Sequence, residues 1–170
     1  SPAVLGLETS TVLVELDLRA GLPAFAVVGL ADVAVQEARE RVRSGIANQA
    51  FTVPARRIVA NLAPADLRKA GPQYDLPLAL AVLAASGQVA PAALAGVGAV
   101  GELALDGALR PVPGALAMAE HAARGGWRRL VVPRANAAEA GLVPGVEVLG
   151  APTLRSAVDQ LEGRCAPEVV

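Results

Sequence analysis

The chain has 170 residues, of which 54% are hydrophobic and 18% charged, and its formal net charge is −1. This composition suits one domain and excludes a disordered chain, while the balanced charge gives no global signal for nucleic-acid or membrane binding. No apolar run approaches the roughly 18 residues of a membrane span, and the single Cys165 is typical of a reducing compartment, so we expect a cytoplasmic protein.

Strand patterns come first along the chain. Alternating apolar residues predict a strand over residues 11–18, with residues 3–7 as its partner and residues 24–28 as a further short strand. Asp32 then begins a predicted helix that reaches about residue 49 and carries an apolar face at helical spacing.

Two features of this helix concern charged side chains. Glu37 and Arg41 are expected to form an i,i+4 pair on the polar face. Arg39 projects near the apolar face, so its guanidinium needs a carboxylate, a carbonyl or a partner protein. The simpler alternative is a stem that carries the charge out to water.

A polar loop follows a predicted strand at residues 58–62 and precedes an apolar helix at residues 76–86, which Asp75 is predicted to cap. Asp106 and Gly107 form a strong turn signal for a hairpin of residues 99–105 and 108–112. The pattern then predicts a helix at 114–124, a strand at 130–132, a helical turn at 136–140, a strand at 146–149 and a helix at 153–161.

The order of these elements sets the fold class. Strands come first and alternation follows, which indicates a mixed α/β or α+β domain. Residues 1–162 are predicted to form this single domain, and residues 163–170 are expected to begin a linker to a further module.

Several patterns resemble chemical sites but favour structural roles. Residues 96–101 match G-x-G-x-x-G, yet they run into a hairpin instead of a helix, so close packing explains them better than a dinucleotide. Asp66 and Asp75 could hold a cation, but capping explains each aspartate alone. His121 has no clustered ligands around it, and no G-x-x-x-x-G-K-[ST] motif occurs. We expect no metal, cofactor or nucleoside triphosphatase site in this chain.

The basic residues give the candidate contact surface. Arg56, Arg57, Arg68 and Lys69, the only lysine, are the predicted contacts to nucleic acid or to a neighbouring subunit. Interspersed acidic residues and the shortage of stacking aromatics argue against a strong isolated nucleic-acid binder. Arg39 and Glu102 are assigned to structural ion pairs, and the candidate partners of Glu102 are Arg39, Arg57 and Arg110.

Five parts of the sequence together resemble one family. They are residues 21–25 with 28–30, then 37–43, 61–77, 100–107 and 132–140. These stretches resemble, in order and over nearly the whole chain, the N-terminal domain of the magnesium-chelatase-like AAA+ ATPases, the ComM/YifB group of bacterial competence proteins.

The resemblance implies an α+β fold of the ribosomal-protein and Lon-protease-domain type, with a mixed sheet and a left-handed βαβ crossover. It also implies a downstream AAA+ module that binds ATP and Mg²⁺ in a hexameric DNA motor, a branch-migration helicase of natural transformation. This domain would help to assemble the ring or guide DNA. Its partners would be its own AAA+ module, neighbouring subunits and single-stranded or branched DNA, with no membrane.

Kinship with Lon-type proteases, which use a Ser–Lys dyad, implies a test of catalysis. Gln73 stands in the loop position of the serine, and Leu116 stands in the position of the lysine. A carboxamide cannot attack a peptide carbonyl and leucine cannot accept a proton, so peptidase activity is not expected. Lys69 precedes the loop and cannot simply substitute. Two alternatives stay open: a pure oligomerisation module without nucleic-acid contact, and a residual hydrolase.

Overall fold

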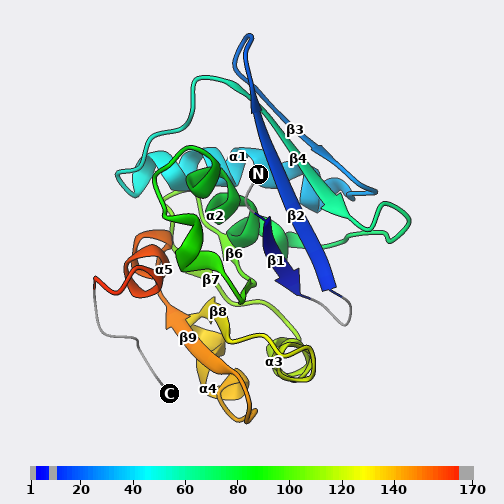
Figure 1. The fold of residues 1–170 in the computed structure, drawn as a ribbon, viewed down its shortest axis with the longest axis vertical. Helices are drawn as coiled ribbons and strands as arrows, with labels where there is room; N and C mark the ends of the chain where they lie inside the picture. The colour runs from blue at the N-terminus through cyan, green and yellow to red at the C-terminus, as the bar shows by residue number, and fades with distance from the viewer. Residues whose placement is uncertain (1–2, 8–10, 165–170) are drawn as a thin grey trace.

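The computed structural model describes residues 3–7 and 11–164, and most of the predicted linker lies outside this part. Seven strands form one sheet in the order β3-β4-β2-β1-β5-β8-β9 (Figure 1). They are β1 (Ala3–Leu7), β2 (Thr11–Arg19), β3 (Ala24–Val28), β4 (Arg57–Ala63), β5 (Val97–Ala99), β8 (Arg129–Pro133) and β9 (Glu147–Ala151). A separate small hairpin pairs β6 (Glu102–Leu103) with β7 (Leu109–Arg110).

Helices connect these strands. The α-helices are α1 (Val33–Asn48), α2 (Asp75–Ala85), α3 (Ala115–Arg124), α4 (Ala137–Ala140) and α5 (Leu154–Leu161). Short 3-10 turns precede or link them: η1 (Pro72–Tyr74), η2 (Pro91–Leu94) and η3 (Arg134–Asn136). In the described residues, every helix is too short or too polar to cross a bilayer.

The sheet is mixed, which confirms the α+β class. β1 pairs antiparallel with β2 and parallel with β5, so it joins an antiparallel half to a parallel half. β3 and β4 are parallel neighbours connected through α1. The left-handed βαβ crossover and the Lon-like assignment stay predictions.

The two faces of the sheet are covered unequally. Residues of α1, α2 and α5 pack on one face against β2, β3, β4, β5, β8 and β9. On β8, Val131 joins this core, whereas Leu130 and Val132 face the opposite side and pack with α3 and α4. In Figure 1, α1 lies behind β3 and β4, and the front of the β3-β4-β2 half carries no helix. The outer face of this half-sheet is therefore open.

The predicted elements agree with the structure in most places. Asp32 caps α1 by accepting a hydrogen bond from Val35 N, and Thr153 caps α5 in the same way. The apolar α2 is enclosed, as predicted, with residues 75–84 all buried. The hairpin prediction was too long: Ala99 belongs to β5 in the main sheet, and only the β6 and β7 residues pair around the turn.

Candidate functional site

The polar loop after β4 is fastened to the connection between β3 and α1. Lys69 N donates to Leu30 O at 2.9 Å, and Asp32 N donates to Lys69 O at 3.0 Å. The Asp32 carboxylate also accepts from Gly71 N at 3.3 Å, in addition to capping α1. The helix cap therefore also holds the loop against the body of the domain.

Lys69 lies inside the domain, with 0% of its surface exposed. Its ammonium group donates to Gly29 O at 2.7 Å and to Pro64 O. Burial lowers the pKa of Lys69, while the charge of Asp66 acts in the opposite direction. The prediction that Lys69 is a surface contact is wrong, because its side chain is buried and donates to two backbone carbonyl oxygens.

A tight turn at Gly29 supplies one acceptor for this lysine. Gly29 has φ +109°, and a Cβ placed there would lie 2.2 Å from Leu62 O. Only glycine fits this combination of left-handed backbone and close approach. The next residue, Leu30, also has a positive φ of 54° and is exposed.

Asp75 is not the helix cap that the sequence predicted. Tyr74 occupies the N-cap position of α2 without a side-chain cap bond. The fully buried Asp75 carboxylate instead accepts from Arg41 Nε at 2.6 Å and Nη2 at 3.0 Å, and from Leu103 N at 3.0 Å. Arg41 also lies 3.8 Å from Glu37, which confirms the predicted i,i+4 pair. Asp75 thus joins α1, α2 and β6.

Opposing forces act on this ion pair. Burial raises the pKa of Asp75, more than the hydrogen bonds from Arg41 and Leu103 lower it. At Arg41 the hydrogen bond to Asp75 outweighs burial and raises the pKa of the guanidinium. The pKa of Asp75 is raised because its side chain is completely buried, whereas the side chain of Arg41 remains partly exposed to water. The ion pair therefore carries a desolvation cost, and it connects α1 specifically to the start of α2.

Gln73 and Leu116, which the family resemblance assigns to the positions of a Ser–Lys dyad, lie on different elements. Gln73 lies buried in η1, and its Nε2 donates to Ala70 O at 2.7 Å. Leu116 lies in the first turn of α3 with its side chain partly exposed. The Gln73 amide closes its own loop, so this residue shapes the backbone before α2.

The predicted basic contact residues do not form one surface, because they lie at opposite ends of β4. Arg56 and Arg57 are exposed at the start of β4, whereas the exposed Arg68 follows its far end. β4 has seven residues, which at about 3.3 Å per residue separates the ends by roughly 20 Å. Arg68 borders a hollow of about 180 Å³ with Leu30 and Ala31.

Arg39 and Glu102 do not form the expected ion pair among the described interactions. Arg39 donates to the carbonyl oxygens of Gln36 at 2.8 Å and Phe25 at 3.4 Å, so backbone takes the place of a carboxylate. Glu102 lies opposite Arg110 in the β6–β7 register, and its charge raises the pKa of Arg41.

Asn136 is an organising residue that the sequence reasoning did not single out. Its side chain accepts from Val112 N and donates to Val112 O, both at 2.9 Å, and it also donates to Glu139. This buried amide replaces a strand partner for the segment before α3. The only sequence signal was an asparagine just before a helical turn.

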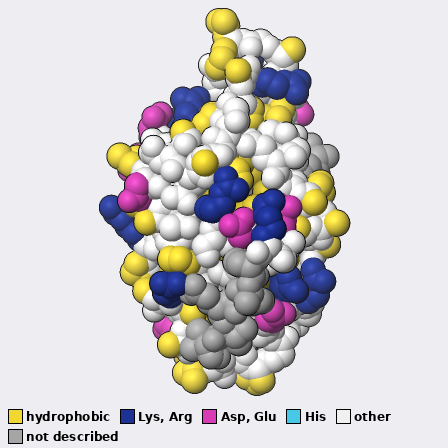
Figure 2. Space-filling view, turned by 90° about the vertical axis from the view of Figure 1, so that its left-hand side faces the viewer, with side chains coloured by type: hydrophobic (Ala, Val, Ile, Leu, Met, Phe, Trp, Pro, Cys, Tyr) yellow, Lys and Arg dark blue, Asp and Glu magenta, His cyan; other side chains and the backbone are white. Residues whose placement is uncertain are grey.

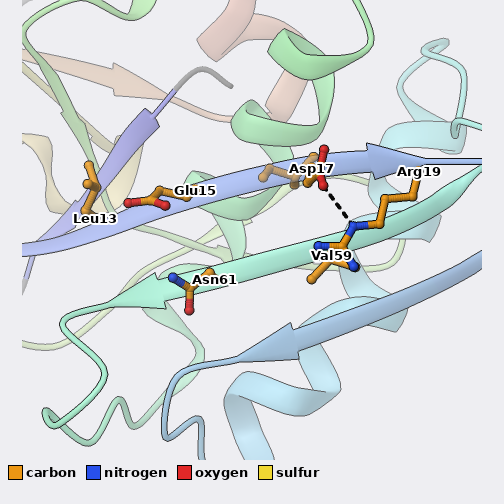
Figure 3. A pocket seen from close by; sticks show the side chains of 7 residues that line it. Leu13, Glu15, Asp17, Arg19, Val59 and Asn61 are labelled. Carbon is orange, nitrogen blue, oxygen red and sulfur yellow. Dashed lines mark hydrogen bonds and ion pairs between the residues drawn. The ribbon is translucent and has the colours of Figure 1, made fainter.

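The open half-sheet carries a shallow hollow of about 540 Å³ on β2 and β4 (Figure 3). Glu15, Asp17, Val59 and Asn61 line it, and Arg19 turns back to Asp17 with an Nε–Oδ2 distance of 2.8 Å. Among the described residues, no three histidines, cysteines or carboxylates gather to hold a metal ion. Asp66 is exposed and Asp75 is buried against Arg41, so the two do not share a site.

Comparison of the sequence with known proteins identifies the family of this chain. Residues 14–136 match the family described as subunit ChlI of Mg-chelatase. The chain is 46% identical over 166 residues to the YifB proteins of Salmonella typhimurium and Escherichia coli, covering 98% of the chain and 33% of each relative. It is 43% identical over 164 residues to the competence protein ComM of Haemophilus influenzae, covering 96% of the chain and 32% of that protein.

The chain thus spans about a third of the length of the curated relatives it matches. The chain belongs to the magnesium-chelatase-like ComM/YifB group, within the ChlI family.

Proposed function

We propose that this chain is the non-catalytic N-terminal domain of a cytoplasmic, hexameric AAA+ DNA motor, a branch-migration helicase of natural transformation. In this proposal the domain helps to assemble the ring or guides DNA to the motor. ATP and Mg²⁺ are assigned to the AAA+ module, outside these 170 residues. The competence name of the Haemophilus relative supports the biological setting.

The observation that supports the proposal is that the polar side chains of the loop are hydrogen-bonded to backbone groups of the domain itself. The amine of Lys69 is buried on two carbonyl oxygens, and the amide of Gln73 is bonded to its own loop. The carboxylate of Asp75 is engaged by Arg41 and by Leu103 N. A nucleophile–base pair needs groups that are free to meet a substrate, so this arrangement favours a positioning role.

Assembly contacts are best supported at the far end of β4, where Arg68 lies. Three exposed aliphatic side chains, Val28, Leu30 and Val33, occupy the neighbouring end of β3 and start of α1. An apolar surface next to one cation suits a neighbouring subunit or the AAA+ module, with apolar burial for affinity and charge for orientation.

The test uses the full-length protein with Arg68→Glu, and Arg124→Glu on the exposed end of α3 as the matched control. Mass photometry with ATP measures ring formation. Arg68→Glu is expected to shift the population to smaller species, and Arg124→Glu to leave it unchanged. A protein that lacks residues 1–162, yet assembles and binds DNA as the intact protein does, would refute the proposal.

Two rival functions are separated by other measurements. Covalent labelling of this domain by an active-site-directed serine probe would favour a residual hydrolase. A pure oligomerisation module predicts impaired ring formation when residues 1–162 are removed, but an unchanged salt dependence of single-stranded DNA binding in Arg68→Ala.

A further inference from the structure

A projecting basic surface, distinct from the loop at Lys69, lies at the other end of β4. We call it the basic tip and define it as Arg19, Leu22, Arg56 and Arg57. In Figure 1 the connection from β2 to β3 projects at the top of the molecule, and residues 19–24 are all exposed. Leu22 has 87% of its surface exposed. Figure 2 shows apolar side chains at this end with basic side chains below them.

The arginines of the basic tip stand in an electrostatically unfavourable register. Arg19 on β2 and Arg57 on β4 are directly opposite each other, and Arg56 immediately precedes Arg57 in the chain. Like charges opposite each other in an antiparallel pair destabilise the sheet. Asp17 pairs with Arg19 and so offsets one of the three charges. Among the described residues no carboxylate pairs with Arg56 or Arg57, so an anionic partner would offset their charge.

The shape of the basic tip argues for a polyanion over a folded protein. The projecting connection between β2 and β3 has only residues 20–23. A stable protein interface takes about 800 Å² and roughly 20–30 residues on each side, whereas the basic tip is defined by four residues. Phosphate contacts need little area, because each arginine fork holds one phosphate and releases counterions. Repetition around a ring multiplies weak contacts.

We infer that the basic tip binds the phosphodiester backbone of single-stranded DNA without reading its sequence. This inference deepens the DNA-guiding role and rests on the proposed function. Arg56 and Arg57 hold phosphates, and Leu22 offers an apolar contact to sugars and bases. The shortage of aromatic side chains, 2% of the chain, removes base stacking as the main source of affinity.

The experiment measures binding of oligo(dT) by the full-length protein across a salt series. Arg56→Ala/Arg57→Ala is compared with Arg110→Ala/Arg124→Ala, which removes the same charge from exposed positions on β7 and α3. Loss of two phosphate contacts is expected to reduce the slope of log K against log salt by about 1.4, while the control keeps the slope. Leu22→Ser is expected to weaken binding and to leave the slope unchanged.

Ring formation by mass photometry accompanies each variant. An unchanged slope in Arg56→Ala/Arg57→Ala with an intact ring would overturn the inference and leave the proposed function standing. Loss of the ring in this variant, at any slope, would assign the basic tip to a neighbouring subunit and also overturn the inference. Failure of the proposed function is recognised separately, by the protein that lacks residues 1–162. A reduced slope with an intact ring supports the inference.

Discussion

Replacing Lys69 by methionine tests whether its side chain holds the loop together. The substitution keeps an unbranched stem of similar length and removes both hydrogen bonds, to Gly29 O and Pro64 O. Charged hydrogen bonds contribute roughly 1.5–3 kcal/mol each, and relief of the buried charge returns part of this. We expect Lys69→Met to lower the free energy of unfolding by about 2–4 kcal/mol. The exposed neighbour change Arg68→Met should stay within about 0.5 kcal/mol.

Urea denaturation of the 170-residue chain measures both variants, and amine labelling gives an independent readout. Lys69 is the only lysine, so mass spectrometry after treatment with an acylating reagent reports one side chain plus the N-terminal amine. Lys69 should stay unmodified in the folded protein and react after unfolding. Equal stability of the two methionine variants, together with rapid native labelling of Lys69, would refute the reasoning.

The lowered pKa of Lys69 predicts how the free energy of unfolding changes with pH. Burial lowers the pKa of Lys69 in the folded state below its ordinary value of 10.5. Between these two pKa values the unfolded chain binds more protons, so stability rises with pH across the window and levels off above 10.5. The difference in stability between the wild type and Lys69→Met should therefore grow as the pH increases through this window. A difference that shrinks would contradict a lowered pKa.

Three further variants test other contacts by urea denaturation. Asp75→Ala should cost about 3–4 kcal/mol, because it leaves Arg41 with a half-buried charge and no bidentate partner; a cost under about 1 kcal/mol would mean that the pair contributes no net stability. Asn136→Ala should cost about 2–3 kcal/mol by removing two buried backbone hydrogen bonds, and a cost under about 0.5 kcal/mol would mean that this amide does not stabilise the segment before α3. Gly29→Ala should cost more than about 2 kcal/mol, whereas Gly21→Ala, also at positive φ but with no atom within 4 Å of the new Cβ, should cost only about 1 kcal/mol; equal costs would show that backbone strain alone matters.

Secondary structure was largely predictable because its signals are local. The alternation in residues 11–18 and the helical spacing after Asp32 depend on neighbours within a few positions, and β2 and α1 follow them closely. The start of the hairpin was misplaced because Ala99 pairs with β1 and β8, strands that are remote in the sequence. Local turn chemistry carries no information about such partners.

The roles of the loop residues could not be predicted, because distant elements set them. Asp75 satisfies the sequence rule for a helix cap equally well, but its partner Arg41 lies on α1, 34 residues earlier in the chain and before β4. The sequence predicts Lys69 to be an exposed basic residue, because nothing local indicates that the turn at Gly29 places a carbonyl oxygen beside its ammonium group. A polar loop in sequence is compatible with either outcome, and only the packing of three segments decides between them.

The position of β1 has a consequence for synthesis on the ribosome. Its backbone aligns Leu5 with Gly98 of β5, while its other edge pairs with β2, the very next strand. During translation the first hairpin can close early, but the second edge of β1 stays unpaired until β5 has been made. An emerging chain therefore displays an unpaired strand edge while the segment between β2 and β5 is synthesised, which is the interval in which chaperones would matter most.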